Sequence, residues 1–303
     1  MRLPGDSAPP ARPVDSATLA RFRTEYLSAP AALPVFERYL PTLSAAAMIG
    51  FLEHHYPSCH ARSHDLGKAL FSASGDLGTA LQECGTGCTS GCMHGVVAQA
   101  FGNEEVGTIT STMNRFCLEG EVARLYKPGN CAHTMGHALM VVTNGDVPHS
   151  IDGCLGFAQT PMAYYCASGV YMEKLVTGPR PRPAPPGSSV HVPCDSEPLF
   201  PAACYRYQGV VLVATLGDRD RAASECLRLD GPRRRGCFHG LGYAAMAMVF
   251  DQPETLAAAC ARGDREDRTA CIEGTIEKVA DVNEQRARAA CGGLDPDIHA
   301  VCD

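Results

Sequence analysis

Fifteen of the sixteen cysteines of this 303-residue chain form two interleaved ladders, and their spacing limits the fold more than any other feature. Steps along the first ladder are 31 to 39 residues long, and steps along the second are 31 to 40. A period near 34 residues is the length of a two-helix unit in helical-repeat proteins. The sequence therefore predicts an all-α fold, an array of about eight helix-hairpin repeats that forms a solenoid or a closed toroid. The first ladder is Cys59, Cys92, Cys131, Cys166, Cys204, Cys237, Cys271 and Cys302, and the second is Cys84, Cys117, Cys154, Cys194, Cys226, Cys260 and Cys291.

Pairing each cysteine of the second ladder with the next one of the first would bridge the loop between the two helices of a unit. Such a bridge is worth about 3 kcal/mol for a loop of this length in the chain-entropy model. Cys88 lies outside both ladders and would pair with Cys59. The competing interpretation, reduced cysteines on zinc, needs close CxxC pairs, which the sequence lacks. The predicted bridges are Cys59–Cys88, Cys84–Cys92, Cys117–Cys131, Cys154–Cys166, Cys194–Cys204, Cys226–Cys237, Cys260–Cys271 and Cys291–Cys302.

Complete pairing favours an oxidising compartment, periplasmic or secreted, although the first twenty residues contain no apolar signal-peptide core. The longest apolar runs are too short for a membrane span. A net charge of −7 with scattered lysines and arginines argues against nucleic acid as the main partner. The bias towards Ala, Arg, Gly and Pro is typical of a GC-rich bacterial genome.

The domain organisation follows from where the helical pattern begins. Residues 1–34 are expected to form a flexible N-terminal tail with at most one short helix. Residues 35–303 are expected to form a single helical-repeat domain. The proline-rich segment 177–193 cannot be helical, and because the ladders keep their period across it, it is expected to be a surface loop of that domain.

Histidines follow several cysteines of the first ladder, and three of them share the pattern His-x-x-Gly-x-Ala. These three are His64, His133 and His239. Elsewhere the place two residues after the cysteine holds other side chains, such as Ser168 and Arg206. The histidine is therefore not a fixed part of the repeat, which is how a site within a repeat array would look. A glycine three residues after a histidine lies on the same helix face and would let another helix or a ligand approach closely.

Two histidine pairs, His60 with His64 and His133 with His137, are four residues apart and would be neighbours on one helix face. Two imidazoles in this arrangement can hold one metal ion. If coiling of the array brings equivalent helix starts together, one multi-histidine centre would form. An all-nitrogen ligand set favours copper or iron, with zinc less favoured. The predicted ligands are His60, His64, His94, His133, His137 and His239.

The leading hypothesis is a metalloprotein, and as an enzyme it would be an oxygen-using oxidoreductase acting on a small molecule or peptide. No catalytic residue is assigned. The alternatives are a non-catalytic scaffold that binds a peptide or protein, and a metal-storage or metal-scavenging protein. Histidines near helix starts can instead satisfy backbone carbonyls, and an extended solenoid would separate successive units by about 10 Å.

The segments Cys59-His60-Ala-Arg-Ser-His64 and Gly91-Cys92-Met93-His94-Gly95 carry CHxxxHxxG and GCxHG motifs. In these motifs the chain resembles a group of bacterial cysteine-rich helical-repeat proteins. The resemblance covers mainly residues 59–140, and a weaker version of the motif recurs at residues 237–244. It implies the repeat fold and brings no activity with it.

Overall fold

The computed structural model describes residues 15–56, 59–85, 87–177, 189–196 and 199–294. Throughout these residues the regular elements are helices, and there is no strand, so the predicted all-α class is confirmed. The chain divides into two compact units, residues 1–100 and 101–303. Both the single domain over 35–303 and the solenoid or toroid remain predictions.

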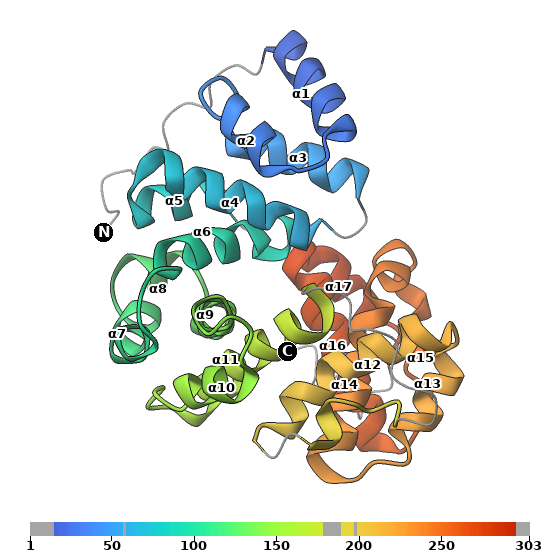
Figure 1. Cartoon of the computed structure of the whole chain (residues 1–303). Coiled ribbons are helices and arrows are strands. Elements are labelled where there is room, and N and C mark those ends of the chain that lie inside the picture. The colour runs from blue at the N-terminus through green and yellow to red at the C-terminus, as the bar shows by residue number, and fades with distance from the viewer. Residues whose placement is uncertain (1–14, 57–58, 86, 178–188, 197–198, 295–303) are drawn as a thin grey trace, which may run out of the picture. The chain divides into compact units, whose positions relative to one another are not determined.

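The first unit contains six α-helices and one short 3-10 helix (Figure 1). They are α1 (Ser16–Ser28), α2 (Leu33–Tyr39), α3 (Ala45–His55), α4 (His60–Ser74), α5 (Leu77–Cys84), η1 (Cys88–Ser90) and α6 (Gly91–Phe101).

The helix α1 lies within residues 1–34, the segment for which the sequence allowed at most one short helix. Asp15 caps this helix by accepting hydrogen bonds from the backbone N–H groups of the second and third residues after it. The Phe22 side chain is completely buried, and its ring centroid lies 6.0 Å from that of Phe36 and 5.3 Å from that of Phe51. Aromatic burial against α2 and α3 therefore orders residues 16–28, whereas residues 1–14 lie outside the described part.

The second unit continues the alternation of shorter and longer helices in the remaining two-thirds of the chain (Figure 1). Its α-helices are α7 (Val106–Leu118), α8 (Gly120–Leu125), α9 (Pro128–Val142), α10 (Val147–Cys154), α11 (Thr160–Met172), α12 (Pro201–Leu216), α13 (Arg219–Cys226), α14 (Gly231–Asp251), α15 (Leu256–Ala259), α16 (Arg265–Val282) and α17 (Glu284–Cys291). Its short elements are η2 (Glu173–Thr177), η3 (Cys194–Ser196) and η4 (Pro253–Thr255).

Seven of the eight predicted disulfides are present. In the clearest repeat, α13 ends at Cys226, a short loop follows, and Cys237 lies in α14, 11 residues further on. This bridge therefore fixes the first half of the longer helix α14 against the end of the shorter helix α13. The eighth predicted bridge, Cys291–Cys302, includes a residue outside the described part of the chain. The seven bridges are Cys59–Cys88, Cys84–Cys92, Cys117–Cys131, Cys154–Cys166, Cys194–Cys204, Cys226–Cys237 and Cys260–Cys271.

The longer helices pack against one another through glycines. A Cβ atom on Gly67 of α4 would lie 2.0 Å from the carbonyl oxygen of Cys92 in α6. In the second unit, Gly136 of α9 has the same relation to the carbonyl of Cys166 in α11, at 2.1 Å. Since both distances are far below van der Waals contact, only glycine allows these backbones to approach so closely. The expected role of the glycine in His-x-x-Gly is confirmed.

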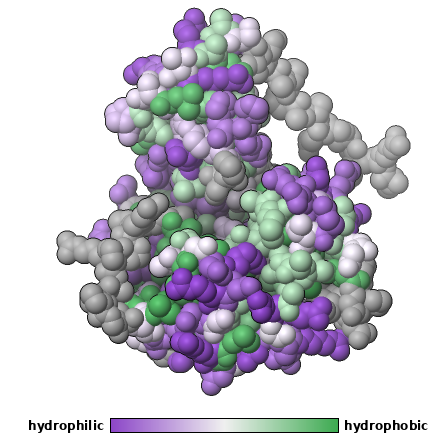
Figure 2. All heavy atoms as spheres, turned by 90° about the vertical axis from the view of Figure 1, so that its right-hand side faces the viewer, coloured by the Kyte–Doolittle hydropathy of each residue, from purple (hydrophilic) through white to green (hydrophobic). Residues whose placement is uncertain are grey.

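Hydrophilic residues cover much of the face drawn in Figure 2, and the hydrophobic areas between them are small. Among the described residues, none of the helices is both long enough and apolar enough to cross a membrane. Most of the predicted surface loop at 177–193 lies outside the described residues, so that loop remains a prediction.

Candidate metal centres

Three histidines come together in the first unit. His60 and His64 lie one turn apart on α4, and His94 lies on α6. Their ring centroids are 5.1 Å apart for His60 and His64, 4.7 Å for His60 and His94, and 5.4 Å for His64 and His94. One ring nitrogen of each residue lies within 4.8 Å of those of the other two. The close approach of α4 and α6 makes this possible, because a Cβ atom on Gly95 would lie 1.9 Å from the His64 carbonyl oxygen.

The hydrogen bonds of His60 define which of its nitrogens carries the lone pair. Its Nδ1 lies 2.9 Å from the Thr89 Oγ1 and 3.2 Å from the Thr89 carbonyl oxygen. The Thr89 hydroxyl donates its own hydrogen to the carbonyl of Cys88, at 2.7 Å. Both atoms of Thr89 therefore accept from an Nδ1–H, and the His60 Nε2 carries the lone pair that a metal needs.

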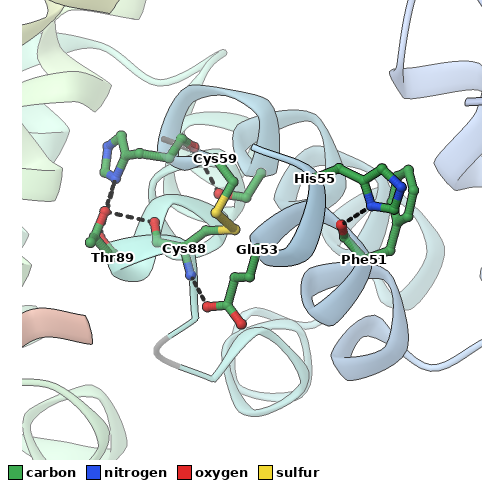
Figure 3. Close-up of a disulfide and its surroundings, with 8 residues drawn as sticks. Phe51, Glu53, His55, Cys59, Cys88 and Thr89 are labelled. Carbon is green, nitrogen blue, oxygen red and sulfur yellow. Dashed lines mark hydrogen bonds between the residues drawn. A yellow bond between two sulfur atoms is a disulfide. The ribbon is translucent and has the colours of Figure 1, made fainter. Parts of the chain in front are cut away.

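The turn that carries Thr89 is held in an unusual backbone conformation. Cys88, Thr89 and Ser90 have φ angles of 51°, 52° and 59°. A positive φ is rare for a residue with a side chain, rarest for β-branched threonine, and costs about 1–3 kcal/mol. The Cys59–Cys88 disulfide fixes this turn beside the start of α4, and the Glu53 carboxylate accepts a hydrogen bond from the Cys88 backbone N–H (Figure 3). The bridge to Cys88, the cysteine outside the two ladders, thus holds both His60 and its hydrogen-bond partner in place.

The second histidine pair lies on α9 in the second unit. The Nε2 atoms of His133 and His137 face each other at 3.2 Å. The His133 Nδ1 lies 2.8 Å from the Ser168 hydroxyl oxygen, whose hydrogen is donated to the backbone carbonyl of Tyr165 at 2.7 Å. The His137 Nδ1 lies 2.7 Å from a carboxylate oxygen of Glu173. In both histidines Nδ1–H is therefore the donor, and the lone pairs are on the two facing Nε2 atoms.

His239 has different neighbours. It lies on α14, with its Nε2 3.3 Å from the Glu277 carboxylate on α16, and Glu277 also pairs with the buried Arg206 of α12. Burial and the Arg206 charge lower the pKa of His239, against the opposing effect of Glu277. Within the described residues His239 belongs to no group of three candidate ligands whose ligand atoms lie within 4.8 Å. Its metal-binding role, and the convergence of all six predicted ligands on one centre, remain predictions.

The ion pair of Glu277 with Arg206 should make folding stability depend on acid. Burial would raise the pKa of Glu277, but the Arg206 and Lys278 charges and the His239 hydrogen bond hold it well below 4.5. A carboxyl with a lowered folded-state pKa stabilises the fold above its unfolded-state pKa, and this stability is lost as pH falls through the folded-state value. We expect Glu277→Gln to lower the free energy of unfolding in urea at pH 7 and to match the native chain in strong acid.

Solvent screening of the partly exposed Glu277 limits the loss of unfolding free energy in Glu277→Gln. Breaking a fully buried pair costs about 3–5 kcal/mol, but the Glu277 side chain is 37% exposed, so we expect about 1–2 kcal/mol. Glu273→Gln is the control, because Glu273 lies on the same helix and pairs with the exposed Arg235. Equal losses in the two variants at pH 7 would contradict the prediction.

Several residues around the histidines carried no signal of their own in the sequence. Thr89 and Glu173 are 29 and 36 residues from the histidines that they contact. Ser168 and Arg206 stood out only as places in the repeat where histidine is missing. Both residues occupy the position that holds a histidine in other repeats. Equivalent positions of neighbouring repeats contact each other, as His133 and Ser168 do, so this equivalence could have predicted the His133–Ser168 contact.

Comparison with known proteins finds no relative of this chain. No family model matches the chain, and it has no match among curated proteins or among solved structures. The fold and the sites define a disulfide-stapled, all-helical protein with histidine groups that are able to hold a metal ion. The resemblance to bacterial cysteine-rich proteins remains a prediction.

Proposed function

We propose that this chain is a metalloprotein and that His60, His64 and His94 hold its metal ion. The observation that carries the proposal is the grouping of three imidazole nitrogens within 4.8 Å of one another on two helices joined by glycine packing. The outer hydrogen bond from the His60 Nδ1–H to Thr89 supports it, because metal-binding histidines almost always donate their second ring nitrogen in this way.

The separation of the nitrogens fits one ion after small ring rotations. Metal–imidazole bonds are about 2.0–2.1 Å long, so three nitrogens on a tetrahedral ion are about 3.4 Å apart. His60 and His94 are buried and would exclude most water from the site. Three protein ligands also leave a fourth position for a substrate or a water molecule.

The ligand chemistry favours copper. The group contains only imidazoles, whereas non-haem iron oxygenases use two histidines and a carboxylate. Among first-row divalent ions, copper binds nitrogen ligands most tightly. Iron is the second candidate and zinc the third. A bound copper ion would supply one-electron chemistry, and an oxygen-using oxidation of a small molecule or peptide is the reaction that we propose.

Metal analysis of the purified chain tests the proposal. We expect stoichiometric metal in the native protein, and a loss of affinity of more than 100-fold at this site in His60→Ala/His64→Ala. Thr89→Val keeps the shape of the side chain and removes the hydroxyl that accepts from His60, so about 10-fold weaker binding is expected. His54→Ala is the control, because His54 is an exposed histidine of the same unit.

The outcomes separate the three functional classes. Binding that is unchanged in His60→Ala/His64→Ala would contradict this centre, and a native chain without any metal affinity would favour the peptide-binding scaffold. Metal binding without oxygen uptake in the presence of reductant and candidate substrates would favour storage.

A further inference from the structure

We infer that His133 and His137 form a second metal site, within the second unit, that binds a divalent transition-metal ion such as Cu(II) through the two Nε2 atoms. It uses none of the residues of the first centre, and its support does not depend on the proposed function. The two histidines lie on adjacent turns of α9, and their partners Ser168 and Glu173 come from α11 and η2.

The lone pairs of His133 and His137 face each other. Because both Nδ1–H groups are donated to oxygens, the two Nε2 atoms at 3.2 Å both present lone pairs. A metal ion or a proton between the two atoms would relieve the repulsion of these lone pairs. Two nitrogens bound to one tetrahedral ion at about 2.0–2.1 Å are separated by about 3.4 Å, close to the observed distance. The pair therefore already has nearly the spacing of two metal ligands.

Each of the two imidazoles has a hydrogen-bond partner behind it. Glu173 accepts from the Nδ1–H of His137, which is the carboxylate–histidine arrangement that orients metal ligands and makes them more basic. Its negative charge also compensates a cation at the pair. Ser168 orients His133 in the same sense, so each imidazole is fixed separately. A proton shared by the two Nε2 atoms is the competing occupant of the gap, and the measurements below distinguish it from a metal ion.

A metal ion on His133 and His137 would need further ligands from outside the pair. The His137 side chain is 3% exposed, and the ring of the buried Tyr207 lies 6.3 Å from the His133 ring, centroid to centroid. Two imidazoles leave at least two coordination positions on the ion. These positions would be filled by exogenous ligands such as water, chloride or a substrate donor atom.

The test is a metal titration of the chelator-treated, folded full-length chain with Cu(II), followed by elemental analysis of the washed protein. We expect two ions per native chain. His133→Ala/His137→Ala should lose one of them and keep the ion at the first centre, whereas His60→Ala/His64→Ala should show the reverse. His149→Ala is the matched control, since His149 is an exposed histidine of the same unit.

Glu173→Gln keeps both imidazoles and guards against a variant that fails to fold. If Glu173 orients a ligand, the variant should keep two ions but bind one of them about 10- to 100-fold more weakly, with an unchanged helical circular dichroism signal. The inference is overturned if the native chain and His133→Ala/His137→Ala bind the same number of ions. It is equally overturned if nitrogen NMR of the chain titrated with Zn(II), a diamagnetic ion that also binds imidazole, shows a retained Nε2-bound proton between the two rings. If His60→Ala/His64→Ala is the only variant that loses an ion, the site at His133 and His137 is contradicted, whereas the proposed function is still supported.

Discussion

Reduction of the disulfides is expected to unfold the protein at room temperature. The seven bridges close loops of 8 to 29 residues. In the chain-entropy model each is worth about 2.5–3.5 kcal/mol, and together they contribute at most about 20 kcal/mol, because their effects are not fully additive. A native domain has only about 5–15 kcal/mol of net stability, so the fold should not survive the loss of all seven.

The measurement is the helical circular dichroism signal during incubation with excess dithiothreitol. We expect it to fall to that of an unfolded chain, and to recover on reoxidation. Cys226→Ser/Cys237→Ser removes a single bridge between α13 and α14 and should cost about 3 kcal/mol while the rest of the chain stays folded. A fully reduced chain that keeps its helical signal and cooperative melting would show that packing alone is sufficient.

The sequence predicted the repeat because the cysteines record its period directly. The connectivity followed from local pairing, since each ladder bridge spans one short loop and leaves few other partners within reach. The packing of α1 carried no signal in the sequence for a different reason. Phe22 is buried by contacts with Phe36 and Phe51, which come from other helices, and nothing in the proline-rich first residues indicates that packing.

The histidine pairs, like the disulfides, were predictable from local spacing, because residues four apart on a helix are neighbours on one face. The partners of the pairs depend on the register between neighbouring helices. Thr89 reaches His60 only through a left-handed turn held by Cys59–Cys88, and Glu173 reaches His137 from η2, directly after α11. A period in the sequence fixes which repeats are equivalent, but it does not fix how far one helix slides along the next.

Gly95→Val should be among the most destabilising single substitutions in the first unit. A Cβ atom at this position would lie 1.9 Å from the carbonyl oxygen of His64 and 2.7 Å from its carbonyl carbon. Both are backbone atoms of α4, which cannot move aside as a side chain can. The two helices would have to separate, and we expect a loss of about 3 kcal/mol or more in urea unfolding. Gly136→Val should act in the same way between α9 and α11.

Gly50→Ala is the matched control for the intrinsic cost of glycine in a helix. No atom lies within 4 Å of a Cβ built there, so we expect about 0.5–1 kcal/mol of added stability. The same packing sets the distance from His94 on α6 to His60 and His64 on α4. Gly95→Val should therefore weaken metal binding at the first centre even under conditions where the chain remains folded. A variant that loses stability but keeps native metal affinity would mean that the imidazoles do not depend on this helix contact to reach a common ion.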